Sequence, residues 1–364
     1  MKIVVWTGPA WETWGPGSLL TGIGGSETAA IHVSTELAKL GHEVEVVGQV
    51  TPCEYRGVRY VRYTDPLSPR ECHRRLECDV FVSSRQLAAN NSLKPDARLK
   101  VLWMHDVHVG PDNSDLMSSY DVVFCLSDWA LQTARRFYPR VPEERFVKTR
   151  NGIDTRRFEL PLCKDGWRVV YSSSPDRGLD KLLDYWPAVR SLRPDAELHV
   201  YYGFDTWEQI ARRRGDDVGL MQIEIFRTRL ANTEGVHSHG RVGQAGLARA
   251  LLKASAWLYP TNFCETSCIT AMEAMAAGAH SVTSRLGALP ETAGFAHLVD
   301  PPNDREGYRA EFLARVERIA RGDFYHEDRD LVTRGREWAL GHLDWSGVAR
   351  QWDEVFRAKT GVDR

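Results

Sequence analysis

The sequence has no long hydrophobic run and no excess of charge of either sign. No apolar stretch approaches the roughly 20 residues that a membrane-spanning helix needs, so we expect no transmembrane segment. The net charge is −2 at pH 7, which provides no general attraction for nucleic acid. The opening MKIVVWTGP has too few apolar residues for a secretory leader and is typical of a first strand. We therefore expect a cytoplasmic protein.

Paired cysteines are also lacking. The seven cysteines stand at positions 53, 72, 78, 125, 163, 264 and 268, scattered and without a CxxC pair. This pattern excludes the usual zinc and redox motifs and predicts reduced thiols. The run from His105 and Asp106 to His108 offers two histidines with no third ligand nearby, a poor metal site. We expect no bound metal.

A dinucleotide-binding G-x-G-x-x-G is absent as well. The loop after the first expected strand is instead long and rich in Gly and Trp, and it ends with Gly24, Gly25, Ser26 and Glu27 at the start of a helix. Glycines there would let backbone N–H groups approach an anion at the helix N-terminus. A purely structural glycine-rich turn fits this loop equally well when it is taken alone.

What the sequence does have is an alternation of strand-like and helical runs, which indicates an α/β fold with parallel sheets. The expected strands are KIVVW, EVEVV, DVFVS, KVLWM, DVVFCL, and then, after a break at 155–166, WRVVYS, ELHVYYG, AWLYP and AHSVTS. The expected helical segments are 26–40, 128–137, 178–191, 206–231, 244–253, 267–277 and a Trp-rich tail at 335–359.

The length of 364 residues suits two domains. We expect two Rossmann-like, doubly wound domains with bounds 1–157 and 158–340. The remaining segment, 341–364, should form a C-terminal helix that packs back on the first domain.

The stretch FCETSCITAME, residues 263–273, places two carboxylates around a turn and helix that are otherwise small and apolar. If the helix starts at Ser267, a good N-cap residue, Glu265 lies just outside it and Glu273 lies on its apolar face. A buried carboxylate is costly unless a group hydrogen-bonds it. A ribose diol would do so, and the amides of 267–270 would receive a diphosphate. A capped helix whose acids reach solvent fits equally well.

Several further segments occur in order around this stretch. They are GIGGSETAAIHVSTELAKLGHEVEVV, VKTRNGIDTRRF, HGRVGQAGLARALLKASAWLYP and MAAGAHSVTSRLGALPET. Together with the E-x7-E spacing of Glu265 and Glu273, they resemble the retaining GT-B glycosyltransferases of family 4, which have a "glycosyl transferases group 1" C-terminal domain. The resemblance implies two Rossmann-like domains facing a cleft, the first on the acceptor side and the second holding a nucleotide diphosphosugar, a UDP- or GDP-sugar.

The resemblance assigns three residues to the chemistry. Glu265 matches a glutamate at the donor sugar, and His105 matches a histidine that faces this sugar. Where relatives have two cations for the diphosphate, this chain reads YSSSPDRGLD, so Arg177 supplies one and the other position falls on Ser172. The implied mechanism is front-face substitution with retention, in which the protein positions the reactants and stabilises charge.

This mechanism needs no metal and no cofactor besides the donor. No DxD sequence follows an expected strand, and DRD at 328–330 lies in a charged helical stretch that we expect to be solvated. The donor-binding residues implied by the resemblance are Gly24, Gly25, Ser172, Arg241, Val242, Thr266, Ser267, Cys268, Ile269 and Glu273. Thr266 and Cys268 replace glycines of the family and would narrow the sugar pocket.

The acceptor is the least defined part. Trp11 and Trp14 in the first loop are candidates to stack on it, and Ser127 matches a serine of the family. As an N-cap of the helix at 128–137, however, Ser127 needs no other role. The basic stretch 134–157 fits either a solvated face or a site for an anionic partner.

We expect a saccharide, lipid-linked or small-molecule acceptor. A hydroxymethylated base in DNA is an alternative acceptor, although DNA would need the basic residues on one face. A non-catalytic nucleotide-sugar binding protein is an alternative to the enzyme. A glycoside hydrolase would need its two acids about 5–10 Å apart across one bond, and two nucleotide-type halves argue against it.

Overall fold

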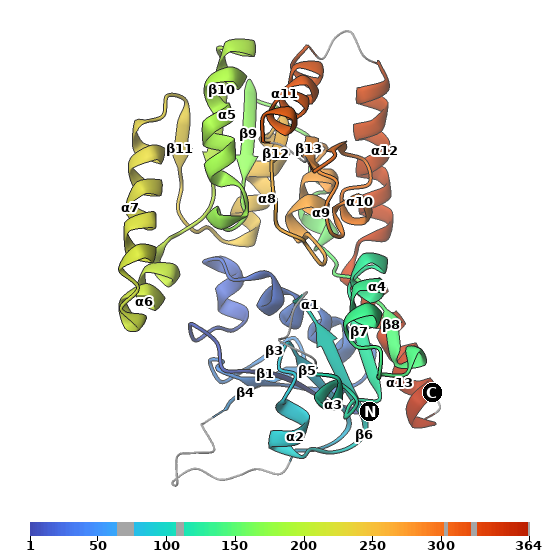
Figure 1. The fold of residues 1–364 in the computed structure, drawn as a ribbon. Helices are drawn as coiled ribbons and strands as arrows, with labels where there is room; N and C mark the ends of the chain where they lie inside the picture. Colours follow the sequence, from blue (N-terminus) through green and yellow to red (C-terminus); the bar gives the residue numbers. More distant parts are fainter. Residues whose placement is uncertain (64–75, 107–112, 302–304, 322–325, 363–364) are drawn as a thin grey trace. The chain divides into compact units, whose positions relative to one another are not determined.

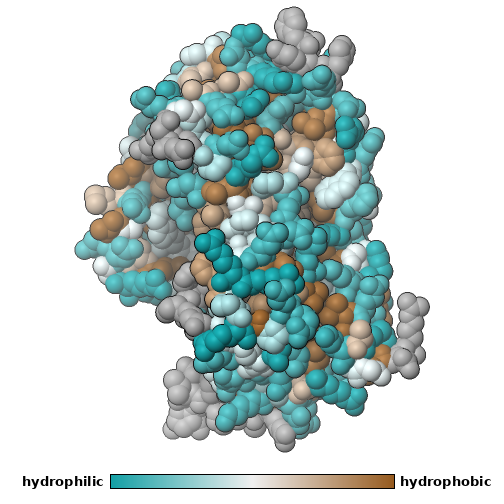
Figure 2. Space-filling view, turned by 45° about the vertical axis from the view of Figure 1, so that its right-hand side comes forward, coloured by the Kyte–Doolittle hydropathy of each residue, from teal (hydrophilic) through white to brown (hydrophobic). Residues whose placement is uncertain are grey.

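The computed structural model describes residues 1–63, 76–106, 113–301, 305–321 and 326–362. The chain divides into two compact units (Figure 1). Unit 1 contains Met1–Leu19, Ile23–Gly152 and Asp344–Arg364, and unit 2 contains Leu20–Gly22 and Ile153–Leu343. No helix in the described part of the chain is long and apolar enough to cross a membrane. The face in Figure 2 is mainly hydrophilic, with hydrophobic residues in small scattered groups.

Unit 1 is built on a sheet that is parallel except for one edge hairpin. Its strands are β1 (Lys2–Gly8), β2 (Glu43–Gly48), β3 (Cys53–Tyr55), β4 (Val58–Arg62), β5 (Glu77–Ser84), β6 (Asp96–Met104), β7 (Val122–Cys125) and β8 (Phe146–Lys148). They lie in the order β3-β4-β2-β1-β5-β6-β7-β8, and only β3 and β4 pair antiparallel. The central strands are nearly continuous apolar runs because helices cover both faces of such a sheet.

The helices of unit 1 are α1 (Gly25–Lys39), α2 (Ala89–Leu93), α3 (Ser114–Met117), α4 (Asp128–Phe137) and α13 (Trp345–Thr360). Helix α13 packs against α1 and β6. Trp352 of α13 inserts its ring edge-on against Trp103, with ring centroids 4.7 Å apart. Its indole N–H donates to the Thr149 hydroxyl at 2.9 Å. The end of the chain therefore contributes to the core of unit 1.

Unit 2 is built on a fully parallel sheet in the order β11-β10-β9-β12-β13-β14. Its strands are β9 (Trp167–Tyr171), β10 (Ala196–Val200), β11 (Val236–Ser238), β12 (Ala256–Tyr259), β13 (His280–Ser284) and β14 (His297–Val299). Its helices are α5 (Leu179–Leu192), α6 (Asp205–Arg214), α7 (Asp217–Asn232), α8 (Gln244–Lys253), α9 (Ile269–Ala276), α10 (Leu289–Thr292), α11 (Arg305–Ala320) and α12 (His326–His342).

The expected α/β class with two doubly wound parallel sheets is confirmed. Helices α4 and α8 have the predicted bounds. The expected helical region 206–231 is two helices, because Gly215 adopts φ +65° and the Asp216 side chain caps the start of α7, accepting from the Gly219 amide at 2.9 Å. The Trp-rich tail is likewise two helices, α12 and α13, with Asp344 as the N-cap of the second.

Two local predictions were wrong. Helix α9 begins at Ile269, because the chain stays extended through Cys268 (φ −79°, ψ 98°), so Ser267 is not its N-cap. Asp328 of α12 is not solvated, since only 4% of the residue is exposed. The Arg318 guanidinium donates to the Asp328 carboxylate at 2.9 and 3.1 Å, and these bonds offset the cost of burying the charge.

Each sheet has a point where the winding of the chain reverses. In unit 1 this point lies between β1 and β5, and in unit 2 it lies between β9 and β12. The loops that follow the two neighbouring strands diverge there, and ligands of open α/β sheets bind in the resulting crevice at the carboxyl ends of the strands. These two places are where the fold directs the search for a site.

Candidate functional site

The switch point of unit 2 brings together the loops that follow β9 and β12. Gly178 ends the first loop at φ +115°, and a Cβ atom there would lie 2.5 Å from the Pro260 carbonyl oxygen of the second loop. Only glycine fits both this conformation and this approach. The two loops are therefore held at a fixed separation.

A buried carboxylate and a cation meet between these loops. Nη1 of Arg177, after β9, donates to Oε1 and Oε2 of Glu265, after β12, at 3.0 and 3.2 Å. The hydroxyl of Tyr259, the last residue of β12, donates to the same Oε1 at 2.7 Å. Glu265 is only 6% exposed, and these bonds are the compensation that a buried charge requires.

The Arg177 side chain is itself 35% exposed. Its guanidinium carbon lies 4.0 Å from the centroid of the Phe263 ring. Burial acts to lower the pKa of Arg177, but the Glu265 carboxylate and other neighbours outweigh it, and the net shift is upward. Within the described residues, only Nη1 of this guanidinium makes a hydrogen bond, so the group can bind a further anion.

The backbone of Glu265 is fixed from the other side. The Ala288 amide donates to its carbonyl oxygen at 2.8 Å. Gly287 lies against it at φ +58°, and a Cβ atom there would come within 2.6 Å of the same oxygen. Glu265 is thus positioned by contacts from the loops after β9 and β13 and from the end of β12.

The second glutamate of the pair, Glu273, lies inside α9 and is 9% exposed. Burial raises its pKa to about 7, an effect that Arg157 opposes and Asp154 reinforces. Arg157 is itself engaged by Asp154, with Nε 3.3 Å from Oδ2, and by Gln244. No described residue donates a hydrogen bond to the Glu273 carboxylate. This group is therefore a buried acceptor that a ligand could satisfy.

The other donor-binding residues predicted in unit 2 differ in their burial and in their hydrogen bonds. Ser172 directly follows β9, and its buried hydroxyl has no hydrogen-bond partner among the described residues. Arg241 is exposed and donates to the Thr206 hydroxyl at 2.9 Å, and Val242 beside it is half-buried. Thr266, Ser267 and Cys268 are buried ahead of α9, and Ile269 begins the helix.

In unit 1, the predicted glycines lie at the start of the helix that follows β1, one of the two strands at the switch point of this unit. Gly24 is the N-cap of α1, and Gly25 is its first residue. The hydroxyl of Ser26, next along the helix, accepts from Arg85 at 3.2 Å and donates to Glu27 at 3.0 Å. The start of α1 is thereby linked to the loop that follows β5.

Arg85 is a residue that the sequence reasoning missed. It follows β5 in a left-handed conformation, φ +67°, which is uncommon for a residue other than glycine. Its guanidinium forms a two-bond ion pair with Asp106 after β6, at 2.9 and 3.0 Å. The available signal was a single arginine two residues after the expected strand DVFVS.

His105 directly follows β6 beside this network. Its ring centroid lies 4.2 Å from that of Trp103. Burial lowers its pKa to about 3, with a further contribution from Arg85, so the imidazole is neutral near pH 7. Asp106 pairs with Arg85, and His108 lies outside the described residues. No described cluster of metal-ligating side chains includes His105.

The structure separates the residues predicted for the acceptor. Trp11 is 58% exposed and remains a candidate. Trp14 is 1% exposed and packs edge-on against Tyr60 with ring centroids 6.5 Å apart, so the prediction that it stacks on an acceptor was wrong. Ser127 is the N-cap of α4, and its hydroxyl accepts from the Ala130 amide at 3.0 Å.

Comparison with known proteins matches residues 168–318 to the family model of the glycosyl transferases group 1. The chain is 29% identical over 241 residues to a phosphatidyl-myo-inositol mannosyltransferase of Mycobacterium tuberculosis, covering 63% of this chain and 58% of that protein. It is 23% identical over 215 residues to a lipopolysaccharide 1,2-N-acetylglucosaminetransferase of Salmonella typhimurium, covering 57% and 52%. The chain thus spans a little over half the length of these curated relatives.

Solved structures resemble the whole chain. Sucrose-phosphate synthase from Thermosynechococcus elongatus has a TM-score of 0.72 at 16% identity, and both chains are fully covered. Anabaena HepE in complex with UDP and glucose has a TM-score of 0.68 at 14% identity, covering 98% of this chain and 100% of that one. At these identities the likeness shows the fold alone. The protein thus has the fold of the GT-B glycosyltransferases, and its segment 168–318, which carries Arg177, Glu265 and Glu273, is similar to the glycosyl transferases group 1 family.

Proposed function

We propose that this protein is a retaining glycosyltransferase that moves a sugar from a nucleotide diphosphosugar to an acceptor hydroxyl. The observation that carries the proposal is the cluster of Arg177, Glu265 and Tyr259 at the β9/β12 switch point of the family segment. A fixed cation beside a buried carboxylate can hold a leaving diphosphate on one side and sugar hydroxyls on the other.

Arg177 is the group that would stabilise the leaving diphosphate. Negative charge grows on the leaving oxygen as the glycosidic bond opens, so a cation that is already in place binds the transition state more strongly than the ground state. The guanidinium is oriented by Glu265 and has N–H groups beyond Nη1 for this purpose. Backbone amides ahead of α9, an eight-residue helix, would add donors without charge.

The two glutamates would then bind different parts of the donor. Glu265 accepts hydrogen bonds from sugar hydroxyls, and Glu273 accepts them from the ribose diol, which would provide the partner that its buried carboxylate lacks. His105, neutral near pH 7, would offer a hydrogen bond to the sugar or the acceptor. The leaving diphosphate oxygen takes the proton of the acceptor hydroxyl, so the donor chemistry uses no metal.

The donor class has support from one solved relative of the same fold, because HepE binds UDP and glucose. The names of the curated relatives favour a lipid-linked or saccharide acceptor, since one is a phosphatidyl-myo-inositol mannosyltransferase and another modifies lipopolysaccharide. We propose a UDP- or GDP-sugar as the donor and a hydroxyl of a glycolipid or saccharide as the acceptor.

The test is a panel of UDP-, GDP- and ADP-sugars incubated with the purified protein, with release of the nucleoside diphosphate as the readout. We expect slow hydrolysis of one donor class without an acceptor and faster release with a saccharide or glycolipid acceptor. NMR of the product should show the anomeric configuration of the donor. A folded protein that neither binds nor cleaves any donor in the panel would refute the proposal, and an inverted product would refute retention.

A further inference from the structure

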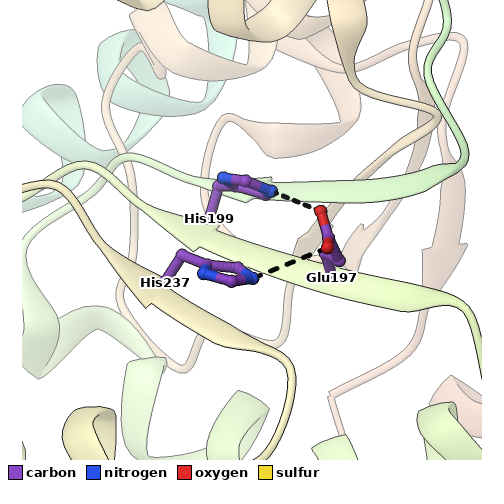
Figure 3. Close-up of side chains that lie close together, drawn as sticks. All are labelled: Glu197, His199 and His237. Carbon is purple, nitrogen blue, oxygen red and sulfur yellow. Dashed lines mark hydrogen bonds and ion pairs between the residues drawn. The ribbon is translucent and has the colours of Figure 1, made fainter.

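A second polar cluster lies at the edge of the unit 2 sheet, away from the loops after β9 and β12. Strands β10 and β11 pair in parallel, with His199 directly opposite His237. Glu197 precedes His199 by two residues on β10, and alternate residues of a strand point to the same face. Glu197, His199 and His237 therefore share one face of this strand pair, as Figure 3 shows.

The ligand atoms of these three side chains converge. Nε2 of His199 lies 3.2 Å from Oε2 of Glu197, and Nε2 of His237 lies 3.7 Å from Oε1 of the same carboxylate. One ligand atom from each residue lies within 4.8 Å of the other two. In a tetrahedral zinc site with metal–ligand distances of about 2.0–2.1 Å, ligand atoms are roughly 3.3 Å apart. Small side-chain movements would bring all three to that separation.

The buried histidine of the cluster is oriented by a further residue. Nδ1 of His199 lies 2.8 Å from Nε2 of His239, and the His239 ring stacks on Tyr201 with centroids 4.5 Å apart. A histidine that binds a metal through one nitrogen usually has its other nitrogen fixed by a hydrogen bond. His239 provides this bond, and it leaves Nε2 of His199 directed toward Glu197.

We propose that Glu197, His199 and His237 bind one divalent cation of borderline softness, such as Zn²⁺ or Co²⁺, through two imidazole nitrogens and one carboxylate oxygen. Imidazole and carboxylate are ligands that these metals accept, and three protein ligands leave a coordination position for water. The cation would tie the short edge strand β11 to β10. The site is separate from the donor chemistry proposed above and needs no donor for its detection.

The positive charge of Arg168 lies close enough to repel a cation at this site, and its removal provides a control. Arg168 of β9 is the strand neighbour of Glu197, and its Nη2 lies 3.9 Å from Oε2 of Glu197. The same nitrogen lies 3.3 Å from Oδ2 of Asp165, which holds part of the guanidinium charge. Because like charges repel over this distance, Arg168→Gln should bind the metal more tightly than the wild type, whereas loss of a ligand should weaken binding.

The experiment is titration of the metal-free protein with Co²⁺, followed by visible absorption and equilibrium dialysis. We expect one Co²⁺ per chain, with ligand-field bands of a nitrogen and oxygen site and no thiolate charge-transfer band. His237→Ala removes a half-exposed ligand and should lower the affinity at least roughly a hundredfold, while His239→Ala should lower it roughly tenfold through its effect on His199. His342→Ala, an exposed histidine on α12, should bind like the wild type.

Thermal stability distinguishes a metal-binding site from a cluster of ion pairs that binds no metal. A ligand that binds only the folded state raises its stability, so Co²⁺ should raise the Tm of the wild type and leave that of His237→Ala unchanged. Without metal, the two proteins should melt alike. Wild-type protein that binds no Co²⁺ below millimolar concentrations, binding through thiolates, or equal binding by His237→Ala would each overturn the proposal. Donor turnover is measured separately and does not bear on these outcomes.

Discussion

Arg177 and Glu265 form an ion pair with two hydrogen bonds, at 3.0 and 3.2 Å, although they lie 88 residues apart in the sequence. The pair joins the loops that follow β9 and β12, the two strands between which the winding of unit 2 reverses. Each partner holds the other in place, so substitution of either changes both the charge and the geometry of the site.

Tyr259→Phe tests whether the position of Glu265 matters for transfer. The substitution removes the hydroxyl that donates to Oε1 at 2.7 Å and leaves both charges in place. The net value of a hydrogen bond to a charged group is about 1.5 kcal/mol, so we expect kcat to fall roughly tenfold while the affinity for the nucleoside diphosphate stays unchanged.

Tyr308→Phe is the matched control for this change, because Tyr308 is also buried and its hydroxyl bonds to Ser284 at 2.6 Å, outside the Glu265 cluster. Both variants should lose similar stability in urea unfolding, and only Tyr259→Phe should lose kcat. An equal kcat for the two would make Tyr259 a purely structural residue.

Glu273→Gln should weaken the binding of the bare nucleoside diphosphate. The proposed contact is to the ribose, so the loss should appear without any sugar on the ligand, and we expect a Kd higher by roughly tenfold, the scale of one hydrogen bond to a charged group. Isothermal titration at pH 8 measures it, since the carboxylate is then ionised. Glu224→Gln, an exposed acid of α7 that pairs with Arg227, serves as the control. An unchanged Kd in folded Glu273→Gln would refute the ribose contact.

The same substitution should change how stability depends on pH. Burial raises the pKa of Glu273 from 4.5 to about 7, so between these values the folded state keeps a proton that the unfolded state has lost. This group therefore favours folding at low pH, and its contribution falls by up to about 1.4 kcal/mol per unit as pH rises through the window. A glutamine at this position cannot ionise, so the variant does not lose this stability as the pH rises.

The measurement is urea unfolding of the wild type and Glu273→Gln at pH 5 and pH 8. From pH 5 to pH 8, the free energy of unfolding of the variant should rise relative to that of the wild type. Subtracting the values of one protein from those of the other cancels the contributions of the other titrating groups. A stability difference that is the same at both values would mean that Glu273 titrates alike in the folded and unfolded states.

Donor turnover should survive chelation. In the proposed mechanism, Arg177 and backbone amides bind the diphosphate. EDTA should therefore leave kcat within about twofold of its value in metal-containing buffer. His237→Ala is the appropriate companion, because it separates any effect of the proposed β10/β11 metal on stability from an effect on transfer. Loss of activity on chelation in both proteins, with recovery on adding Mn²⁺, would replace the metal-free mechanism.

The fold class and the cap of α4 could be predicted from the sequence because their causes are local. Alternating strand and helix periods predicted both sheets, and a serine before an acidic first turn predicted the cap that Ser127 provides. The spacing of Glu265 and Glu273 likewise placed one acid before α9 and one inside it, but acids that reach solvent fitted the sequence equally well, and the structure shows that both are buried.

What could not be predicted depends on the order and register of strands. The sequence pointed to Arg177 and Glu265 separately, but their pairing follows from β9 lying beside β12. Trp14 became a core residue because its segment bridges to Val50, a contact that no local pattern indicates. The Glu197 cluster was visible only as Glu and His two apart in ELH, and as HSH further on. That these side chains converge follows only from the strand register, which places His199 beside His237.

The most direct test of the central claim is donor turnover by Arg177→Ala. Loss of this preorganised cation should lower kcat/KM at least roughly a hundredfold, mostly through kcat, because the charge it stabilises grows in the transition state. Arg229→Ala is the matched control: Arg229 is similarly exposed, 32% against 35%, and pairs with Asp184 at 2.7 Å. It should turn over like the wild type. A folded Arg177→Ala protein that keeps most of its kcat would contradict the assignment of the diphosphate to Arg177.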